Sequence, residues 1–459
     1  MWIAGVAVSV LLGYSIMSVA ALRLSFLEKA GLAFPAGMMF QTLLMLGMDA
    51  VWVGLGSMKV VWISLVLIVA LNAMLWSRRQ EVAGIWKERY TGLRELKVNA
   101  VWLLFIVLTA YLEYLNWSKS MFFPTFDRDS VSGFDTIGWI ASQEQTLKGL
   151  SIFRSNYMPY VNGPGSYITY MPMVQLSYAY VYGLGAETSK IIPALMYLSF
   201  LIAFYGVTRR FVGKTAAAMT VFFTLITPEM LAFSSLSITN VIHAVYASLG
   251  VAYTVLWLRE GEKKFFWPSI LFTAGGLWVR NESIVFVVAS IVFIFLLSSR
   301  KKENWLYAVL TLLPFILWTT FMQVNGIHAE GILRIIPLWD MDKAGVIAQY
   351  FFVLFTSQNY YGLTFIAFTL ALLINLINLL PALRRQVRHE DVPLLGITFL
   401  SLLLYILLIY QIEYKWDAIE NVLSYSVKRF LFCFIPLLWL YTFSNRYMRR
   451  FFGWLEKTV

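Results

Sequence analysis

Apolar stretches long enough to cross a membrane recur along this 459-residue chain and limit what it can fold into. A spanning helix needs roughly 20 mostly apolar residues, because its backbone groups must pair with one another in hydrocarbon. About 13 stretches meet this criterion, near residues 2–22, 36–57, 60–77, 99–117, 189–207, 215–234, 240–258, 265–279, 283–299, 304–323, 350–380, 393–411 and 428–444. The sequence therefore predicts an all-α polytopic membrane protein with about 13 transmembrane helices.

The composition excludes an ordinary water-soluble enzyme. Hydrophobic residues make up 59% of the chain and charged residues only 13%, whereas soluble domains carry about 25% charged residues. The single cysteine, Cys433, rules out an intramolecular disulfide and a cysteine-based zinc or iron–sulfur cage. The three histidines lie far apart in the sequence and lack the spacing of metal ligands.

Positive charge gathers in alternate loops and predicts the orientation of the chain in the membrane. Loops 23–35, 78–98, 208–214, 259–264, 300–303, 381–392 and 445–459 hold 24 of the 36 Lys and Arg residues, but only 10 of the 25 Asp and Glu residues. Because Lys and Arg accumulate on the cytoplasmic side, we expect an external N-terminus and a cytoplasmic C-terminus in a bacterial cytoplasmic membrane. The net charge of +11 is then an orientation signal, and it gives no support to a nucleic-acid partner.

The same pattern predicts the domain organisation. Residues 1–77 form a three-span N-terminal extension, residues 78–98 a basic cytoplasmic connector, and the remaining spans the body of the protein. The longest external loop covers residues 118–188.

Three carboxylates open this long loop. Asp127, Asp129 and Asp135 are followed from Thr136 by an apolar stripe of helical period, which predicts a short amphipathic helix lying in the membrane interface. Asp135 at its start is either an N-cap for free backbone N–H groups or a general base for an acceptor hydroxyl. Asp127 and Asp129 are either solvated loop charges or ligands of a divalent cation.

Other candidate residues lie in the loop and at the external ends of later spans. Tyr160, Asn162 and Tyr167 belong to a Pro- and Gly-rich turn, in which tyrosine rings either stack on sugars or anchor at lipid headgroups. Arg280 and Glu282 form either a helix-holding ion pair or part of a phosphate site, because a guanidinium matches phosphate oxygens. Lys428 and Arg429 are a similar basic pair, placed on the side where positive charge is not expected from topology.

Four motifs in this order resemble the GT-C class of integral-membrane glycosyltransferases, which use polyprenyl-phosphate-linked sugars. The segment GFDTIGWIASQEQTLKGLSI is similar to the class's Asp-bearing stretch, with an aromatic residue, Trp139, four positions after Asp135. YMPYVNGPGSY resembles its second loop motif, GGLWVRNES its Arg-x-Glu region, and SYSVKRFLFCFIPLLW its last span. The likeness divides the body into a catalytic module, residues 99–300, and a C-terminal transmembrane module, residues 301–459.

This resemblance implies a reaction and its partners. Asp135 is the expected base, and Asp129 or Asp127 positions the acceptor or a divalent cation. Arg280, Lys428 and Arg429 are expected to stabilise the charge of the leaving phosphate. Tyr160, Asn162, Tyr167, Trp139 and Glu282 are the remaining expected substrate contacts. The expected partners are a polyprenyl-phosphate-linked sugar donor, a glycan, lipid or protein acceptor, and the lipid bilayer. Some relatives carry a Glu in the second loop motif, and Asn162 and its neighbours provide no such carboxylate.

Two other classes stay open on the sequence alone. A transporter or lipid flippase for a glycoconjugate needs ionisable residues at the membrane midplane, and Asp49, Glu113 and Glu229 are the acidic residues inside predicted spans. A non-catalytic membrane scaffold leaves the acidic loop without a role.

Overall fold

The computed structural model describes residues 1–84, 99–151, 170–327, 333–335, 340–378, 391–414 and 418–458. Tyr160, Asn162, Tyr167 and most of the predicted connector lie outside these residues. The described chain is helical apart from one short antiparallel pairing of β1 (Leu333–Ile335) with β2 (Ile412–Tyr414), in which Leu333 faces Tyr414. The prediction of an all-helical polytopic chain is therefore confirmed at this level.

The elements of the first half, in chain order, are α1 (Trp2–Ala20), α2 (Phe26–Ala50), α3 (Ser57–Ser77), α5 (Ala100–Phe122), η1 (Ser130–Phe134), α6 (Asp135–Glu144), α8 (Met173–Gly183), α9 (Ile191–Thr208), α10 (Lys214–Leu225) and α11 (Pro228–Phe233). Those of the second half are α12 (Asn240–Glu260), α13 (Lys263–Val279), η3 (Asn281–Ser283), α14 (Ile284–Leu297), α15 (Lys301–Val324), α16 (Met341–Thr356), α17 (Gln358–Tyr361), α18 (Thr364–Asn378), α19 (Asp391–Gln411), α20 (Ile419–Val422), η5 (Leu423–Val427), α21 (Lys428–Phe430), η6 (Leu431–Cys433), α22 (Ile435–Ser444) and α23 (Arg446–Thr458).

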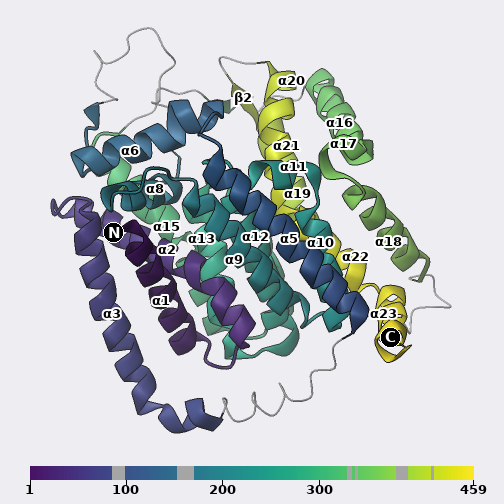
Figure 1. The fold of residues 1–459 in the computed structure, drawn as a ribbon. Helices are drawn as coiled ribbons and strands as arrows, with labels where there is room; N and C mark the ends of the chain where they lie inside the picture. The colour runs from purple at the N-terminus through teal and green to yellow at the C-terminus, as the bar shows by residue number, and fades with distance from the viewer. Residues whose placement is uncertain are drawn as a thin grey trace.

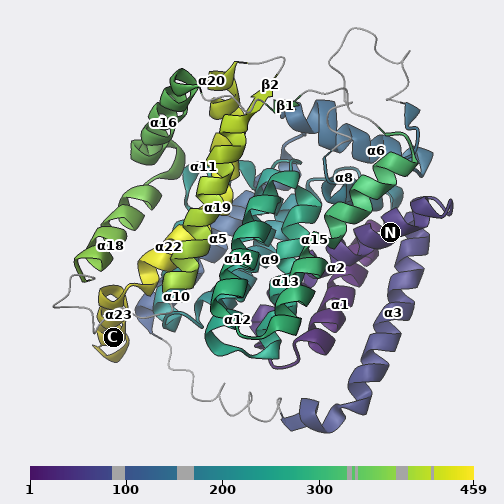
Figure 2. The ribbon, with the colours of Figure 1, turned by 180° about the vertical axis from the view of Figure 1, so that it is seen from behind.

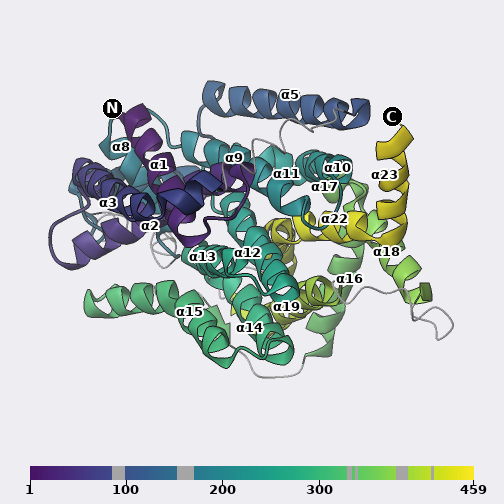
Figure 3. The same cartoon turned by 90° about the horizontal axis from the view of Figure 1, so that it is seen from below.

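Eight of the described helices are long and apolar enough to cross a membrane, and a bent pair at the end of the chain makes up to nine. Helix α12 is central: 94% of its apolar stretch is buried inside the protein, whereas only 11% of α3 and of α5 is. Seen from below (Figure 3), α12 lies in the middle, with α5 and α15 on opposite sides. Figure 2 shows α13, α14, α15 and α19 together on one face of the bundle.

The N-terminal helices pack directly into the bundle. Helices α1 and α2 meet at Gly13 and Gly37, where an added Cβ would lie 1.8 Å from the backbone oxygen of Ala33 or of Ser9. Such small residues let two helices approach closely and gain van der Waals contact. This packing holds helices together in lipid, because acyl chains are as apolar as the helices and no hydrophobic force drives the helices into contact. The other side of α2 reaches the body, because Trp278 donates a hydrogen bond to Thr42 and Tyr246 donates one to the backbone oxygen of Pro35.

The predicted start of the second span is wrong. It was expected near residue 36, after a loop over 23–35, but α2 begins at Phe26 and continues through Pro35. Ser25 and Glu28 form a capping box, in which each side chain bonds the backbone N–H of the other residue. This satisfies two N–H groups at the start of the helix and fixes its first turn.

Three other predicted spans are broken or bent. The stretch 215–234 divides into α10 and α11 at Pro228, and the stretch 350–380 divides into α16, α17 and α18, with Gly362 at a φ of 56°. The last span bends by 45° between η6 and α22, next to Pro436. Pro228 and Pro436 each lie in the first turn of the helix after the break, where the missing N–H of proline costs no helical hydrogen bond.

The bundle has two polar ends. We call the end that carries α6, α8 and α11 the α6 end; it is the upper end in Figure 1. The opposite end carries the turns after α1, α9 and α12, where Glu28 and Arg210 form an ion pair of 2.8 Å.

Candidate functional site

The α6 end is built on a continuous helical segment, η1 followed by α6. Asp127 starts it, because its carboxylate accepts hydrogen bonds from the backbone N–H and the hydroxyl of Ser130, at 3.2 and 3.4 Å. The predicted apolar stripe is confirmed within α6, where Ile137, Ile140 and Ala141 are buried. Helix α6 packs on α8 through Gly138, at which an added Cβ would lie 2.7 Å from the Cβ of Tyr178.

Asp135 makes a hydrogen bond that its position in the chain did not indicate. It lies inside the helical segment, and its Oδ1 accepts a hydrogen bond of 2.7 Å from the hydroxyl of Tyr182 on α8. The same hydroxyl accepts a hydrogen bond from the backbone N–H of Ser189, at 3.2 Å. Asp135 is therefore not the N-cap, a role that Asp127 fills, and its carboxylate is oriented by a tyrosine instead.

Burial and the negative charge of Asp135 both raise the pKa of Tyr182, with the hydrogen bond between them adding to the effect. The Tyr182 hydroxyl consequently keeps its proton over the whole physiological range, and it acts as a fixed donor to Asp135.

Asp129 forms an ion pair with Arg429, although 300 positions separate them. The Nε of Arg429 also donates a hydrogen bond of 2.8 Å to the backbone oxygen of Tyr425. Two of the predicted site residues, one from the long loop and one from the last span, are thus in contact.

Arg280 and Glu282 form the second pair, in the turn between α13 and α14. Arg280 is 7% exposed, and its Nη2 and Nε donate to the two carboxylate oxygens of Glu282 at 2.6 and 3.3 Å. Its Nη1 donates to Thr239, and its guanidinium lies 5.5 Å from the ring centre of Tyr170. The charges of both pairs, Arg280–Glu282 and Asp129–Arg429, act on the Tyr170 hydroxyl, whose pKa burial raises. The Tyr170 hydroxyl is thus within electrostatic reach of both pairs.

Lys428 forms a third pair. Its Nζ lies 2.9 Å from a carboxylate oxygen of Glu229 on α11 and 4.7 Å from the ring centre of Tyr360. Glu229 was counted among the acidic residues inside predicted spans, but it belongs to the α6 end.

The other two acidic residues of predicted spans differ from each other. Asp49, at the end of α2, accepts hydrogen bonds from the hydroxyl of Thr146 and the backbone N–H of Leu147. Glu113 is buried within α5, where Asn116 donates to one carboxylate oxygen at 3.4 Å and the other oxygen has no partner among the described residues.

A divalent cation does not fit the acidic residues that were proposed to hold it. Asp127 caps η1 and Asp129 binds Arg429, so the two carboxylates serve separate partners. Among the described residues, no group of three or more His, Cys, Asp or Glu side chains could hold a metal ion.

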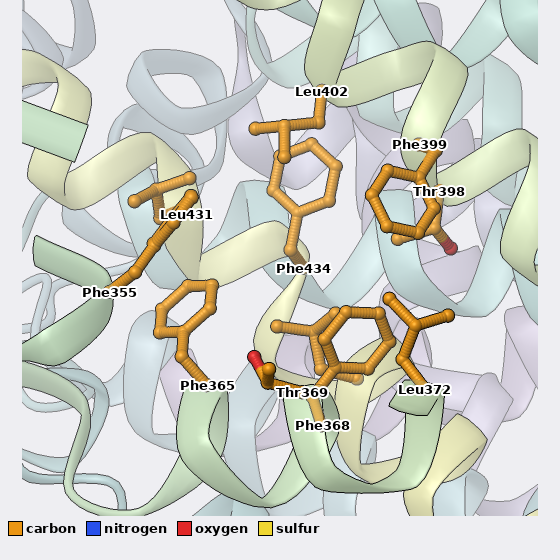
Figure 4. Close-up of a pocket in the computed structure, with 11 residues that line it drawn as sticks. Phe355, Phe365, Phe368, Thr369, Leu372, Thr398, Phe399, Leu402, Leu431 and Phe434 are labelled. Atoms are coloured by element: carbon orange, nitrogen blue, oxygen red, sulfur yellow. The ribbon is translucent and has the colours of Figure 1, made fainter. Parts of the chain in front are cut away.

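An apolar pocket of about 220 Å³ lies beside the last span. Figure 4 shows phenylalanine rings from α16, α18 and α19 facing it together with Phe434, next to α22. Leu431, also in its wall, belongs to the same last span as Lys428 and Arg429.

Several residues of the α6 end were missed in the sequence. Tyr182 binds Asp135, and Ser189 binds the same tyrosine hydroxyl, yet no periodic pattern connects either residue to Asp135. Trp139, which was predicted, is 53% exposed on α6. Local spacing indicated Arg280 with Glu282, but nothing local indicates that Arg429 meets Asp129 or that Lys428 meets Glu229.

Compared with models of known protein families, with curated proteins and with solved structures, the chain matches none.

Proposed function

We propose that this protein is an integral-membrane glycosyltransferase with about 13 spans and with α6 at the external interface. It transfers a sugar from a polyprenyl-phosphate donor to an acceptor hydroxyl, with inversion of configuration. Asp135 is the general base, and the acceptor is a glycan, a lipid or a protein.

The observation that carries this proposal is the setting of Asp135. Its carboxylate is partly buried at the start of α6 and is held by one hydroxyl, that of Tyr182, while no cation forms an ion pair with it among the described residues. A base must be oriented but must keep a lone pair for the proton it accepts. Asp129, Glu229 and Glu282 are each paired with a cation and are less suited to this role.

Three changes make up the proposed reaction. The acceptor oxygen forms a bond to the anomeric carbon, the bond between that carbon and the phosphate oxygen breaks, and the acceptor proton passes to Asp135. The transition state has oxocarbenium character, so negative charge grows on the leaving phosphate and must be stabilised by cations at the same end. The apolar pocket beside Leu431 and Phe434 supports the proposal, since a prenyl chain needs a hydrocarbon-lined site.

The test is a donor-turnover assay with Asp135→Asn. Purified protein is incubated with membranes as the source of acceptor and with a panel of polyprenyl-phosphate sugars, and released polyprenyl phosphate is measured. We expect the variant to lose about 10²- to 10⁴-fold in turnover, the usual contribution of a positioned base. Asp127→Asn is the matched control, because Asp127 lies in the same segment but only caps η1. Full turnover by Asp135→Asn excludes Asp135 as the base.

A transporter or flippase is the second candidate function, and the burial of the Glu113 carboxyl within α5 favours it. A buried carboxyl within a membrane helix, with one oxygen unpartnered among the described residues, is typical of ion and proton pathways. The same assay separates the two functions, because transport leaves the sugar–phosphate bond intact. Glu113→Gln should leave turnover unchanged in a glycosyltransferase and abolish substrate movement in a transporter.

A further inference from the structure

The cations that the sequence assigned to the phosphate are already neutralised in the structure. Arg280 is bound to Glu282, Lys428 to Glu229, and Arg429 to Asp129. Each pair has no net charge, so a phosphate that bound there would first have to compete with a carboxylate.

Lys190 is in a different situation. Its side chain is buried, and its Nζ donates one hydrogen bond of 2.6 Å to the backbone oxygen of Phe123. An ammonium group has three N–H donors, and no carboxylate lies within ion-pair distance of Lys190 in the part of the chain that the structure describes. Lys119, on the last turn of α5, likewise donates to a backbone oxygen, that of Ala232, at 3.4 Å.

Lys190 adds positive charge at a position where the local structure disfavours it. Lys190 is the N-cap of α9, and a helix N-terminus already carries a partial positive charge that disfavours a lysine. Burial lowers the pKa of Lys190, the charge of Lys119 lowers it further, and Asp135 opposes them. The two helices are joined at this point, because the hydroxyl of Ser120, the residue after Lys119 on α5, donates to the backbone oxygen of Lys190 at 3.1 Å.

The backbone next to Lys190 is linked to the proposed base. The Tyr182 hydroxyl links the Asp135 carboxylate to the backbone N–H of Ser189, the residue before Lys190. One tyrosine thus links the proposed base to the start of α9, where Lys190 is the N-cap, and neither Lys190 nor Lys119 forms an ion pair with a carboxylate among the described residues.

We propose that Lys190 and Lys119 form a phosphate-binding site at the junction of α5 and α9. The proposal rests on the proposed function, in which a phosphate leaves the anomeric carbon beside Asp135, and it names the cations that receive that phosphate. Ammonium groups bind phosphate oxygens through charge-assisted hydrogen bonds, and the two lysines have donors left for them.

The experiment measures binding, without turnover, to the full chain in detergent. The probes are farnesyl phosphate, inorganic phosphate and farnesol, and the variants are Lys190→Gln, Lys119→Gln, Lys190→Arg and the control Lys148→Gln. We expect each glutamine variant to weaken farnesyl phosphate binding by about tenfold or more, and the arginine and Lys148 variants to bind normally. Lys148 suits the control because it lies over the ring of Trp52, away from Asp135. Normal folding of each variant is checked by its unfolding temperature.

The probes distinguish the sources of the phosphate. Lysine-dependent binding of farnesyl phosphate alone identifies a lipid phosphate, and binding of both phosphates identifies a site for the phosphate group itself. Equal binding of farnesol and farnesyl phosphate, or unchanged binding by the glutamine variants, overturns the proposal. This outcome is separate from the failure of the proposed function: if no sugar is transferred but both lysines are needed to bind phosphate, the site stands and the glycosyltransferase assignment fails.

Discussion

Buried or partly buried carboxylates occur at both ends of the bundle, but their partners differ. At the opposite end, Glu28 is fully buried and accepts hydrogen bonds from Arg210 and from the backbone N–H of Ser25, at 2.8 and 2.9 Å. At the α6 end, Asp135 has a neutral tyrosine hydroxyl as its hydrogen-bond donor. Glu28 thus has the partners of a structural ion pair, whereas Asp135 has those of a group that must still accept a proton.

The sharpest test of this comparison exchanges one carboxylate for an amide at each end. Glu28→Gln should lower the free energy of unfolding by about 1–3 kcal/mol, because it leaves the partly buried Arg210 without its counter-charge. Asp135→Asn should change it by less than about 1 kcal/mol while lowering turnover by about 10²- to 10⁴-fold. Denaturant unfolding in detergent and the donor assay measure the two quantities. If both variants lose stability equally, the distinction between the two ends is wrong.

A second prediction concerns the contact that positions Asp135. Gly138→Val should push α6 away from α8, since an added Cβ there lies 2.7 Å from Tyr178 and 3.1 Å from the backbone oxygen of Gln175. Displacing a catalytic group by about 1 Å costs as much as 10²-fold in rate. Gly47→Val is the control, because that helical glycine has open space around it. Equal turnover by both variants argues against positioning by α6.

The local parts of this site could be predicted from the sequence, and its long-range parts could not. The stripe of Ile137, Ile140 and Ala141 gave helix α6, because helical period is a property of neighbouring residues. The capping box of Ser25 and Glu28 was also readable as a helix start, and overlooking it misplaced α2.

The pairing of Asp129 with Arg429 spans 300 positions and depends on how the last helices pack, which no local pattern records. For the same reason the hydrogen bond from Tyr182 to Asp135 could not be predicted, because it depends on how α6 packs on α8. Hydropathy predicted where helices form, but the breaks at Pro228 and Gly362 show that an apolar stretch does not fix a single straight span.

A third prediction is that Tyr182→Phe lowers turnover by about tenfold without removing the base. The hydroxyl orients Asp135 and does not itself transfer a proton, since burial and Asp135 raise its pKa. The loss should therefore be the same at pH 6 and at pH 9. A loss confined to high pH would mean that the tyrosine titrates during the reaction, contrary to a positioning role.

A fourth prediction concerns phosphate binding at high pH. Binding needs the ammonium form of Lys190, and its pKa lies below the ordinary value of 10.5 because of burial and Lys119. Affinity for farnesyl phosphate should thus be full at neutral pH and should fall, as the pH rises, at a lower pH than an ordinary lysine would give. In Lys190→Arg the fall should move to higher pH, because a guanidinium keeps its proton. Identical pH profiles for the two proteins would remove Lys190 from the phosphate site.

The smallest expected effect is that of Trp139→Ala. The side chain is 53% exposed on α6, so its removal should change the free energy of unfolding by less than about 0.5 kcal/mol. It lies one helical turn after Asp135 on the same helix, and an exposed indole offers a face for stacking. We therefore expect KM for the donor to rise a few-fold with kcat unchanged, the signature of lost uniform binding. Trp305, 64% exposed on α15, is the matched control for an exposed tryptophan. If Trp139→Ala and Trp305→Ala give the same KM, the indole at position 139 faces lipid and not the substrate, and the base acts without an aromatic neighbour on its own helix.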